Sequence, residues 1–191
     1  MLQMTHPEHD EHPTQMSSTP PPFTASSHAF DGKKHLLLAA SGSVATIKIP
    51  NILHALSTHP HLSILLILTR SAANFLAGQS AEQPPVESLR QIPNVDGIFL
   101  DEDEWVHPWT RGQGILHIEL RRWAHVLVIA PLSANTLAKI TGGFADNLLT
   151  SVVRAWDTEG VIEGPGLGGK RRRIVVAPAM NTAMWRHPVT R

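Results

Sequence analysis

Four groups of polar side chains in this sequence follow short apolar runs, and their types suit the binding of a phosphate or a polar ring edge. Residues 41–43 (SGS), 69–71 (TRS) and 133–136 (SANT) supply hydroxyl, amide and guanidinium groups, and Asn181 follows a fourth run. A helix N-terminus beside such side chains offers unpaired backbone N–H groups to an anion. His117 lies one short predicted helix upstream of the third run and can transfer protons near neutral pH. Together these residues point to a nucleotide-like ligand.

The apolar runs predict the strands that must position these side chains. The run at 126–130 has no polar alternation, as expected of a parallel strand covered on both faces. Strands are predicted over residues 35–40, 62–68, 126–130 and 174–177, with a short edge strand at 97–100. We expect Pro131 and Pro178 to stop the third and fourth of these strands, and we expect all four to be buried.

Helical patterns alternate with these strands. Residues 44–57 show apolar spacing close to that of a helix, which Pro50 should kink or divide. A short helix is predicted between Leu116 and the strand at 126, and another is predicted to begin at Asn74. Two more helices are predicted, one over 134–140 and one from a cap at Asp146 or Asn147 to Trp156. The alternation indicates a doubly wound parallel sheet, in which ligands bind beyond the carboxyl ends of the strands.

The turn at Gly42 and Ser43 is a candidate phosphate cradle. Glycine lets the backbone approach a ligand closely, and the serine hydroxyl adds to the amides of the following helix. The turn lacks the GxGxxG fingerprint, which disfavours a dinucleotide site of the usual kind.

Composition excludes several classes of protein. Sixteen basic and sixteen acidic residues leave no net charge, so nothing indicates attraction to nucleic acid or to a membrane surface. The 191 residues contain no cysteine, which excludes disulfides and thiolate metal sites. No run reaches the roughly 18 apolar residues of a membrane span. A cytoplasmic protein is expected, and the low charged fraction of 17% suggests surface that faces another subunit.

Four other features of the sequence are interpreted as having no binding or catalytic role. Residues 1–32 are rich in proline, serine, threonine and histidine and predict a disordered N-terminal arm before a domain over 33–191. A metal site at His6, His9 and His12 is disfavoured against a polar tail, and no metal site is expected. The acidic residues 101–104 predict a solvated turn, and residues 158–173 predict a surface loop.

The sequence resembles the flavoprotein family of cysteine decarboxylases, in particular its branch that contains phosphopantothenoylcysteine decarboxylases and halotolerance proteins. The resemblance covers residues 34–191 and rests on ASGSVATIK, TRSA, DEDEW, LHIELRRWAHVLVIAPLSANTLAKITGG, DNLLTSVVRAWD and PAMNTAMW, which occur in this order. It implies a flavodoxin-like fold, bound FMN, and a trimer with sites between subunits. The implied substrate is 4′-phosphopantothenoylcysteine, which is decarboxylated to 4′-phosphopantetheine in coenzyme A synthesis.

The resemblance also implies roles for individual residues. His117 matches the family's catalytic base, and Asn181 matches the residue that holds the substrate carboxylate. The implied flavin contacts are Gly42, Ser43, Val44, Ser71, Ser133, Ala134, Asn135, Thr136 and Ala179. From residue type alone, His117 would be interpreted as a packed histidine and Asn181 as a helix cap.

The chain departs from the family pattern in two places. His125 stands where the family often has aspartate, which we interpret as a tolerated change. The family pattern continues with a flap whose cysteine completes turnover, so the sequence predicts either a fragment or a mixed trimer with a related subunit. Two alternatives stay open, namely a flavin-binding inhibitory subunit of a protein phosphatase involved in salt tolerance, and decarboxylation of a peptide's C-terminal cysteine. The phosphatase alternative is disfavoured because an acidic tail is lacking. The peptide alternative is disfavoured because HIELRRWA closely matches the phosphopantothenoylcysteine branch.

Overall fold

The computed structural model describes residues 22–106, 108–162 and 171–190. Within these ranges, no helix has both the length and the apolar character that crossing a membrane would require. The polar tail predicted at His6, His9 and His12 lies outside the described residues, and so do residues 163–170 of the predicted loop at 158–173.

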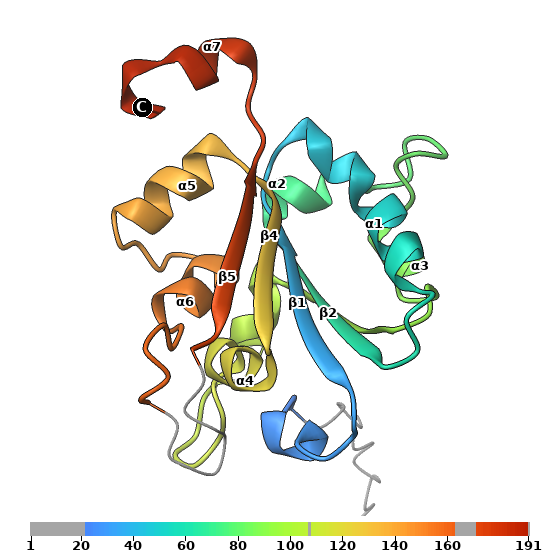
Figure 1. Ribbon diagram of the computed structural model, residues 1–191, viewed down its shortest axis with the longest axis vertical. Helices are drawn as coiled ribbons and strands as arrows, with labels where there is room; N and C mark the ends of the chain where they lie inside the picture. Colours follow the sequence, from blue (N-terminus) through green and yellow to red (C-terminus); the bar gives the residue numbers. More distant parts are fainter. Residues whose placement is uncertain (1–21, 107, 163–170, 191) are drawn as a thin grey trace, which may run out of the picture.

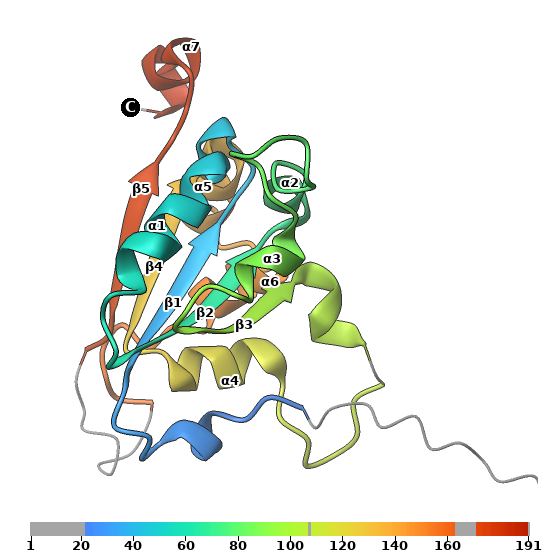
Figure 2. The same ribbon diagram turned by 90° about the vertical axis from the view of Figure 1, so that its right-hand side faces the viewer.

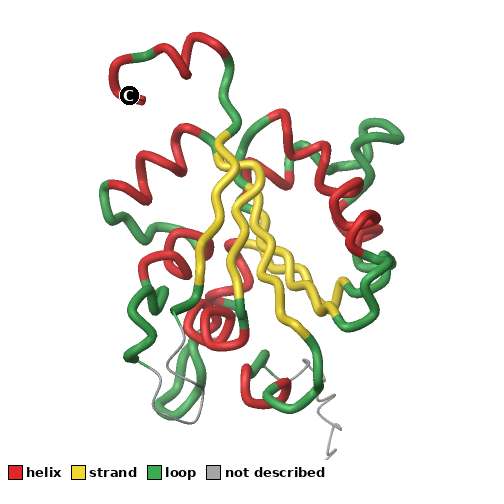
Figure 3. Tube along the Cα trace, viewed as in Figure 1, coloured by secondary structure: helices red, strands yellow, loops and turns green. Residues whose placement is uncertain are grey.

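A parallel sheet forms the centre of the described structure (Figures 1 and 3). Its strands are β1 (Lys34–Ala40), β2 (Leu62–Leu68), β3 (Val95–Leu100), β4 (Val126–Leu132) and β5 (Arg173–Pro178). Their order across the sheet is β3-β2-β1-β4-β5, and each neighbouring pair is parallel. The prediction of a doubly wound parallel sheet is confirmed, and the order reverses between β1 and β4, where such sheets bind ligands.

Helices cover both faces of the sheet (Figure 2). The described α-helices are α1 (Ile49–Leu56), α2 (Arg70–Ala73), α3 (Val86–Leu89), α4 (Leu116–Trp123), α5 (Ala134–Thr141), α6 (Leu148–Arg154) and α7 (Thr182–Arg186). Side chains of β1 alternate between two cores: Leu36 and Leu38 pack with α1 and α3, whereas Leu37 packs with α4 and α6. The segment 44–57 is divided, as predicted, because the 3-10 helix η2 (Val44–Lys48) precedes α1 and Pro50 lies in the first turn of α1.

The predicted strand end at Pro131 is wrong, whereas the last strand ends at Pro178, as expected. Strand β4 continues through Pro131 to Leu132, and β5 includes Pro178. Proline removes one backbone donor but leaves its carbonyl, and the Pro131 carbonyl accepts the N–H of Ser41 at 3.0 Å. The register between β4 and β5 also shifts between Ile129 and Leu132, so the pairing accommodates the proline.

The prediction that β5 is buried is also wrong. Val175 and Val176 are 49% and 47% exposed. The strand lies at the edge of the sheet, and β4 is its hydrogen-bonded neighbour. Short apolar runs do not distinguish an edge strand from a central one, because that depends on what packs around them.

The N-terminal arm was predicted to be disordered as far as residue 32, and this boundary is wrong. Residues 25–28 form the 3-10 helix η1 (Ala25–His28). Phe23 packs edge-on against Phe99 and Trp123, and the Ala25 N–H donates to Glu119 Oε2 at 2.7 Å. The Phe23 ring and the Ala25 N–H therefore hold the segment against α4. The polar composition of the segment does not predict these contacts.

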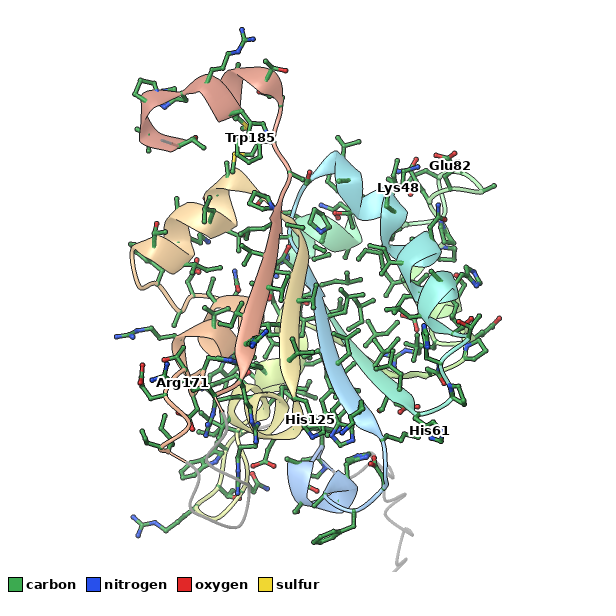
Figure 4. The ribbon with its side chains drawn as sticks, viewed as in Figure 1. Lys48, His61, Glu82, His125, Arg171 and Trp185 are labelled. Atoms are coloured by element: carbon green, nitrogen blue, oxygen red, sulfur yellow. The ribbon has the colours of Figure 1, made fainter. Side chains whose placement is uncertain are left out.

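His125 lies at the entrance to β4, below the centre of Figure 4. Its Nδ1 accepts the backbone N–H of His35 at 2.9 Å, and the two rings stack with centroids 4.8 Å apart. Burial, followed by the nearby charges of His35 and Arg172, lowers the pKa of His125. An aspartate carboxylate could accept the same N–H, so the change preserves an acceptor at this position.

Candidate functional site

A cavity of about 550 Å³ opens at the carboxyl edge of the sheet. The turns after β1, β2 and β4 contribute to it, as do the segment after β3 and the start of α6. Its lining residues are Gly42, Thr69, Arg70, Ser71, Asp101, Glu104, Trp105, Ser133, Asn135, Thr136, Lys139, Ala145, Asp146, Asn147, Leu148 and Ser151. A volume of this size and a polar lining suit a nucleotide-sized ligand.

Gly42 closes one wall of the cavity against α2. A Cβ atom at this position would lie 2.5 Å from the Cβ of Ser71, a separation that real side chains do not adopt. Only glycine therefore allows the turn after β1 to approach the turn after β2 so closely. The role of this turn as a phosphate cradle stays a prediction.

A buried hydroxyl network ties the ends of β1 and β4 together. The Ser133 N–H donates to Ser41 Oγ at 2.8 Å, and the Ser41 hydroxyl reaches the Pro131 carbonyl at 3.2 Å. Ser133 Oγ in turn accepts the Thr136 N–H and caps α5. Ser41 belongs to the predicted polar turn 41–43 but is not one of the implied flavin contacts.

Two further helices begin at the cavity. Thr69 caps α2 and Asn147 caps α6, the second as predicted. The carboxylate of Asp101 accepts the Leu148 N–H at 3.2 Å and the Arg70 N–H at 3.3 Å, so it joins the two helix starts. Helix α2 begins at Arg70, before the predicted start at Asn74, because the Thr69 hydroxyl supplies the cap.

Ion pairs balance the charges around the cavity. The Lys139 ammonium hydrogen-bonds Asp146 and lowers the pKa of that carboxyl. Arg70 pairs with Glu102 at 2.8 Å, and this hydrogen bond lowers the pKa of Glu102. Both pairs are substantially exposed, so their contribution to stability is small.

The acidic run 101–104 was predicted to be a solvated turn, and this is wrong for two of its members. The run forms the 3-10 helix η3 (Asp101–Trp105), in which Asp101 and Glu104 line the cavity. Glu104 Oε1 lies 2.8 Å from His117 Nδ1, with side-chain exposures of 4% for the glutamate and 21% for the histidine. The DEDEW segment therefore belongs to the site.

The remaining predicted residues lie outside this cavity. Ser43 donates to the Ala179 carbonyl at 3.2 Å, so these two residues connect the ends of β1 and β5. Val44 is 67% exposed. Val44, Ala134 and His117 are not among the lining residues.

Asn181 occupies a separate place in the fold. Its Oδ1 accepts the Met184 N–H at 2.9 Å and caps α7, and the residue is exposed. Helix α7, which carries Trp185, extends past the carboxyl edge of the sheet, whereas α4 crosses it near the opposite end (Figures 1, 2 and 4). One chain therefore does not bring Asn181 and His117 together.

A parallel sheet with helices on both faces and a polar cavity at its switch point defines a doubly wound α/β protein, consistent with a flavodoxin-like fold, and the order β3-β2-β1-β4-β5 is of the Rossmann type. The family model described as "Flavoprotein" matches residues 24–191, and the chain belongs to this family. A probable phosphopantothenoylcysteine decarboxylase of Arabidopsis thaliana is 46% identical over 83% of this chain and 66% of its own length.

Solved structures support the same family. One described as "The FMN binding protein AtHal3" is 45% identical, with a TM-score of 0.65 over 83% of this chain and 72% of that one. A phosphopantothenoylcysteine (PPC) decarboxylase with a cysteine-to-serine change, complexed with pantothenoylaminoethenethiol, is also 45% identical. Its TM-score is 0.62 over 83% of this chain and 73% of that one. The chain spans 62–66% of the length of three plant relatives.

Proposed function

We propose that the chain binds FMN in the cavity at the carboxyl edge of the sheet. The polar cavity of about 550 Å³, which the turns after β1, β2 and β4 line at the carboxyl edge of the sheet, carries the proposal. Ser71, Asn135 and Thr136 supply polar groups beside two helix starts. When bound, FMN supplies the capacity to accept two electrons, which no side chain has.

We propose that the reaction is decarboxylation of 4′-phosphopantothenoylcysteine. Oxidation of the cysteine side chain from CH2–SH to the thioaldehyde CH=S removes two protons and two electrons, for which bound FMN would be the acceptor of the electrons and of one proton, and the thioaldehyde then stabilises the charge left as carbon dioxide departs. His117 is the base that takes the other proton, since an imidazole is suited to proton transfer near neutral pH. Asn181 holds the carboxylate, because a neutral amide binds it without favouring the charged ground state as strongly as arginine would.

We propose that the sites are shared between subunits of a trimer, either of this chain alone or mixed with a related subunit. The separation of α4 and α7 within one chain supports this arrangement. Exposed apolar side chains on β5 and α7, namely Val175, Val176, Met184 and Trp185, offer surface for association. We place the protein in the cytoplasm.

Anaerobic mixing of the FMN-loaded chain with 4′-phosphopantothenoylcysteine tests the proposed reaction. We expect the yellow absorbance to bleach once and carbon dioxide to form in an amount equal to the flavin. Little phosphopantetheine should appear, because none of the 191 residues is the cysteine that the family uses to complete turnover. Absorbance and mass analysis of the products provide the readouts.

The control is the same mixture with phosphopantothenate, which has no cysteine to oxidise and should leave the flavin yellow. Sustained phosphopantetheine formation over many turnovers would contradict the assigned role of the cysteine. Unchanged flavin with substrate, together with inhibition of a protein phosphatase, would instead favour the regulatory alternative.

A further inference from the structure

The pair formed by Glu104 and His117 joins two elements that lie next to each other. Glu104 is near the end of η3, after β3, and His117 is in the first turn of α4. Glu104 Oε1 lies 2.8 Å from His117 Nδ1, and within the described part of the chain Nε2 has no hydrogen-bond partner. An ionised carboxylate only accepts hydrogen bonds, so beside ionised Glu104 the hydrogen lies on Nδ1 and the free lone pair on Nε2.

This arrangement carries a folding cost. The side chain of Glu104 is 4% exposed, and its second oxygen, Oε2, is buried without a hydrogen-bond partner among the described residues. A buried carboxylate with one unsatisfied oxygen destabilises the folded state, and such groups in native structures call for an explanation. Glu104 also lines the cavity, so one residue contacts both that cavity and His117.

The other acidic side chains of η3 have different partners. Asp101 accepts backbone N–H groups at the starts of α2 and α6, and Glu102 pairs with Arg70. Asp103 accepts the Leu100 N–H at 2.7 Å. Glu104 alone of these four residues is hydrogen-bonded to a histidine.

We propose that Glu104 is a positioning residue for His117. Its carboxylate fixes the rotation of the imidazole and selects the tautomer with hydrogen on Nδ1, which leaves Nε2 ready to receive a proton. The step adds no reactant, because the proton taken at Nε2 comes from the substrate. This inference rests on the proposed role of His117 as the base.

The tautomer is measured directly by heteronuclear NMR of the histidine ring nitrogens, at a pH well above the ordinary imidazole value of about 6.5. The wild-type chain should show His117 with hydrogen on Nδ1, and Glu104→Leu should shift it towards the Nε2–H form that predominates in free imidazole side chains. Glu102→Leu, an exposed neighbour in the same 3-10 helix, is the matched control and should leave the His117 signal unchanged. An Nε2–H tautomer in the wild-type chain would overturn the proposal.

Kinetics and stability separate positioning from a structural role. Glu104→Leu should slow anaerobic reduction of bound flavin by substrate about 10–100-fold, less than the about 10²–10⁴-fold expected for losing the base itself. Glu104→Gln should recover most of this rate, because its amide oxygen still accepts from Nδ1. The Tm of Glu104→Leu should be unchanged or higher, since a half-satisfied carboxylate is removed.

These measurements distinguish a failure of the inference about Glu104 from a failure of the proposed function. A lower Tm with an unchanged tautomer and rate would assign Glu104 a structural role and overturn the inference. A chain that binds no flavin, yet shows the Nδ1–H tautomer that depends on Glu104, would overturn the proposed function while leaving the positioning of His117 intact.

Discussion

Replacing His117 by alanine is expected to slow anaerobic reduction of bound flavin by 4′-phosphopantothenoylcysteine by about 10²–10⁴-fold, the range that a positioned acid or base contributes. The side chain is 21% exposed and is held by Glu104 at one nitrogen, so the other nitrogen is available to a substrate. Because His117 does not line the cavity, the variant should bind FMN as the wild-type chain does. Stopped-flow absorbance measures the reduction rate.

His54→Ala provides the control for this experiment. His54 is exposed on α1, which packs on the other face of the sheet from α4. Its replacement should change the rate by less than about 2-fold, as expected for a surface substitution away from any site. A His117→Ala chain that keeps its flavin and reduces it at the wild-type rate would remove His117 from the mechanism.

Mixing two inactive variants is expected to restore flavin reduction if the sites are shared between subunits. Helices α4 and α7 lie apart within one chain, so the proposed arrangement requires Asn181 of one subunit to join His117 of another. We pair His117→Ala with Asn181→Asp. The aspartate keeps the cap on α7, since its carboxylate can still accept the Met184 N–H, but it repels the substrate carboxylate.

Each variant alone should be inactive, and random mixing in a cyclic trimer should restore about a quarter of the sites, because each site takes one residue from each of two subunits. The control is a mixture of His117→Ala with Glu104→Leu. Glu104 in η3 contacts His117 in α4 of the same chain, so no site regains both groups, and the activity should not exceed that of the Glu104→Leu chain alone. Mixed oligomers are confirmed by mass. Confirmed mixed oligomers without any regained activity would show that the residues do not meet across an interface.

The sequence predicted those parts of the site that depend on strand ends. Uninterrupted apolar runs fix the parallel strands, and the carboxyl ends of parallel strands meet at one edge, so Gly42, Ser71, Ser133 and Thr136 could be placed together. Their caps also follow from local chemistry, because serine, threonine and asparagine at a helix start accept backbone N–H groups.

The role of the acidic run could not be predicted in the same way. Four consecutive acidic residues have the composition of a solvated turn, and only the packing of η3 against α4 places Glu104 beside His117. Similarly, Phe23 is one aromatic residue in a polar segment, and its contact with Trp123 spans most of the domain's sequence. Long-range contacts of this kind leave no local pattern.

Titration of the purified, metal-free and flavin-free chain with FMN, followed by equilibrium dialysis and absorbance, tests the central claim most directly. We expect saturable binding of one FMN per chain. Gly42→Val should weaken binding at least about 100-fold, a loss of roughly 2.7 kcal/mol, since its side chain would overlap that of Ser71 and force apart two turns that line the cavity. Val161→Ala, at an exposed position outside the cavity lining, should bind as the wild-type chain does. A folded wild-type chain that takes up no FMN, or a folded Gly42→Val chain that binds it equally well, would contradict the placement of a flavin site in this cavity.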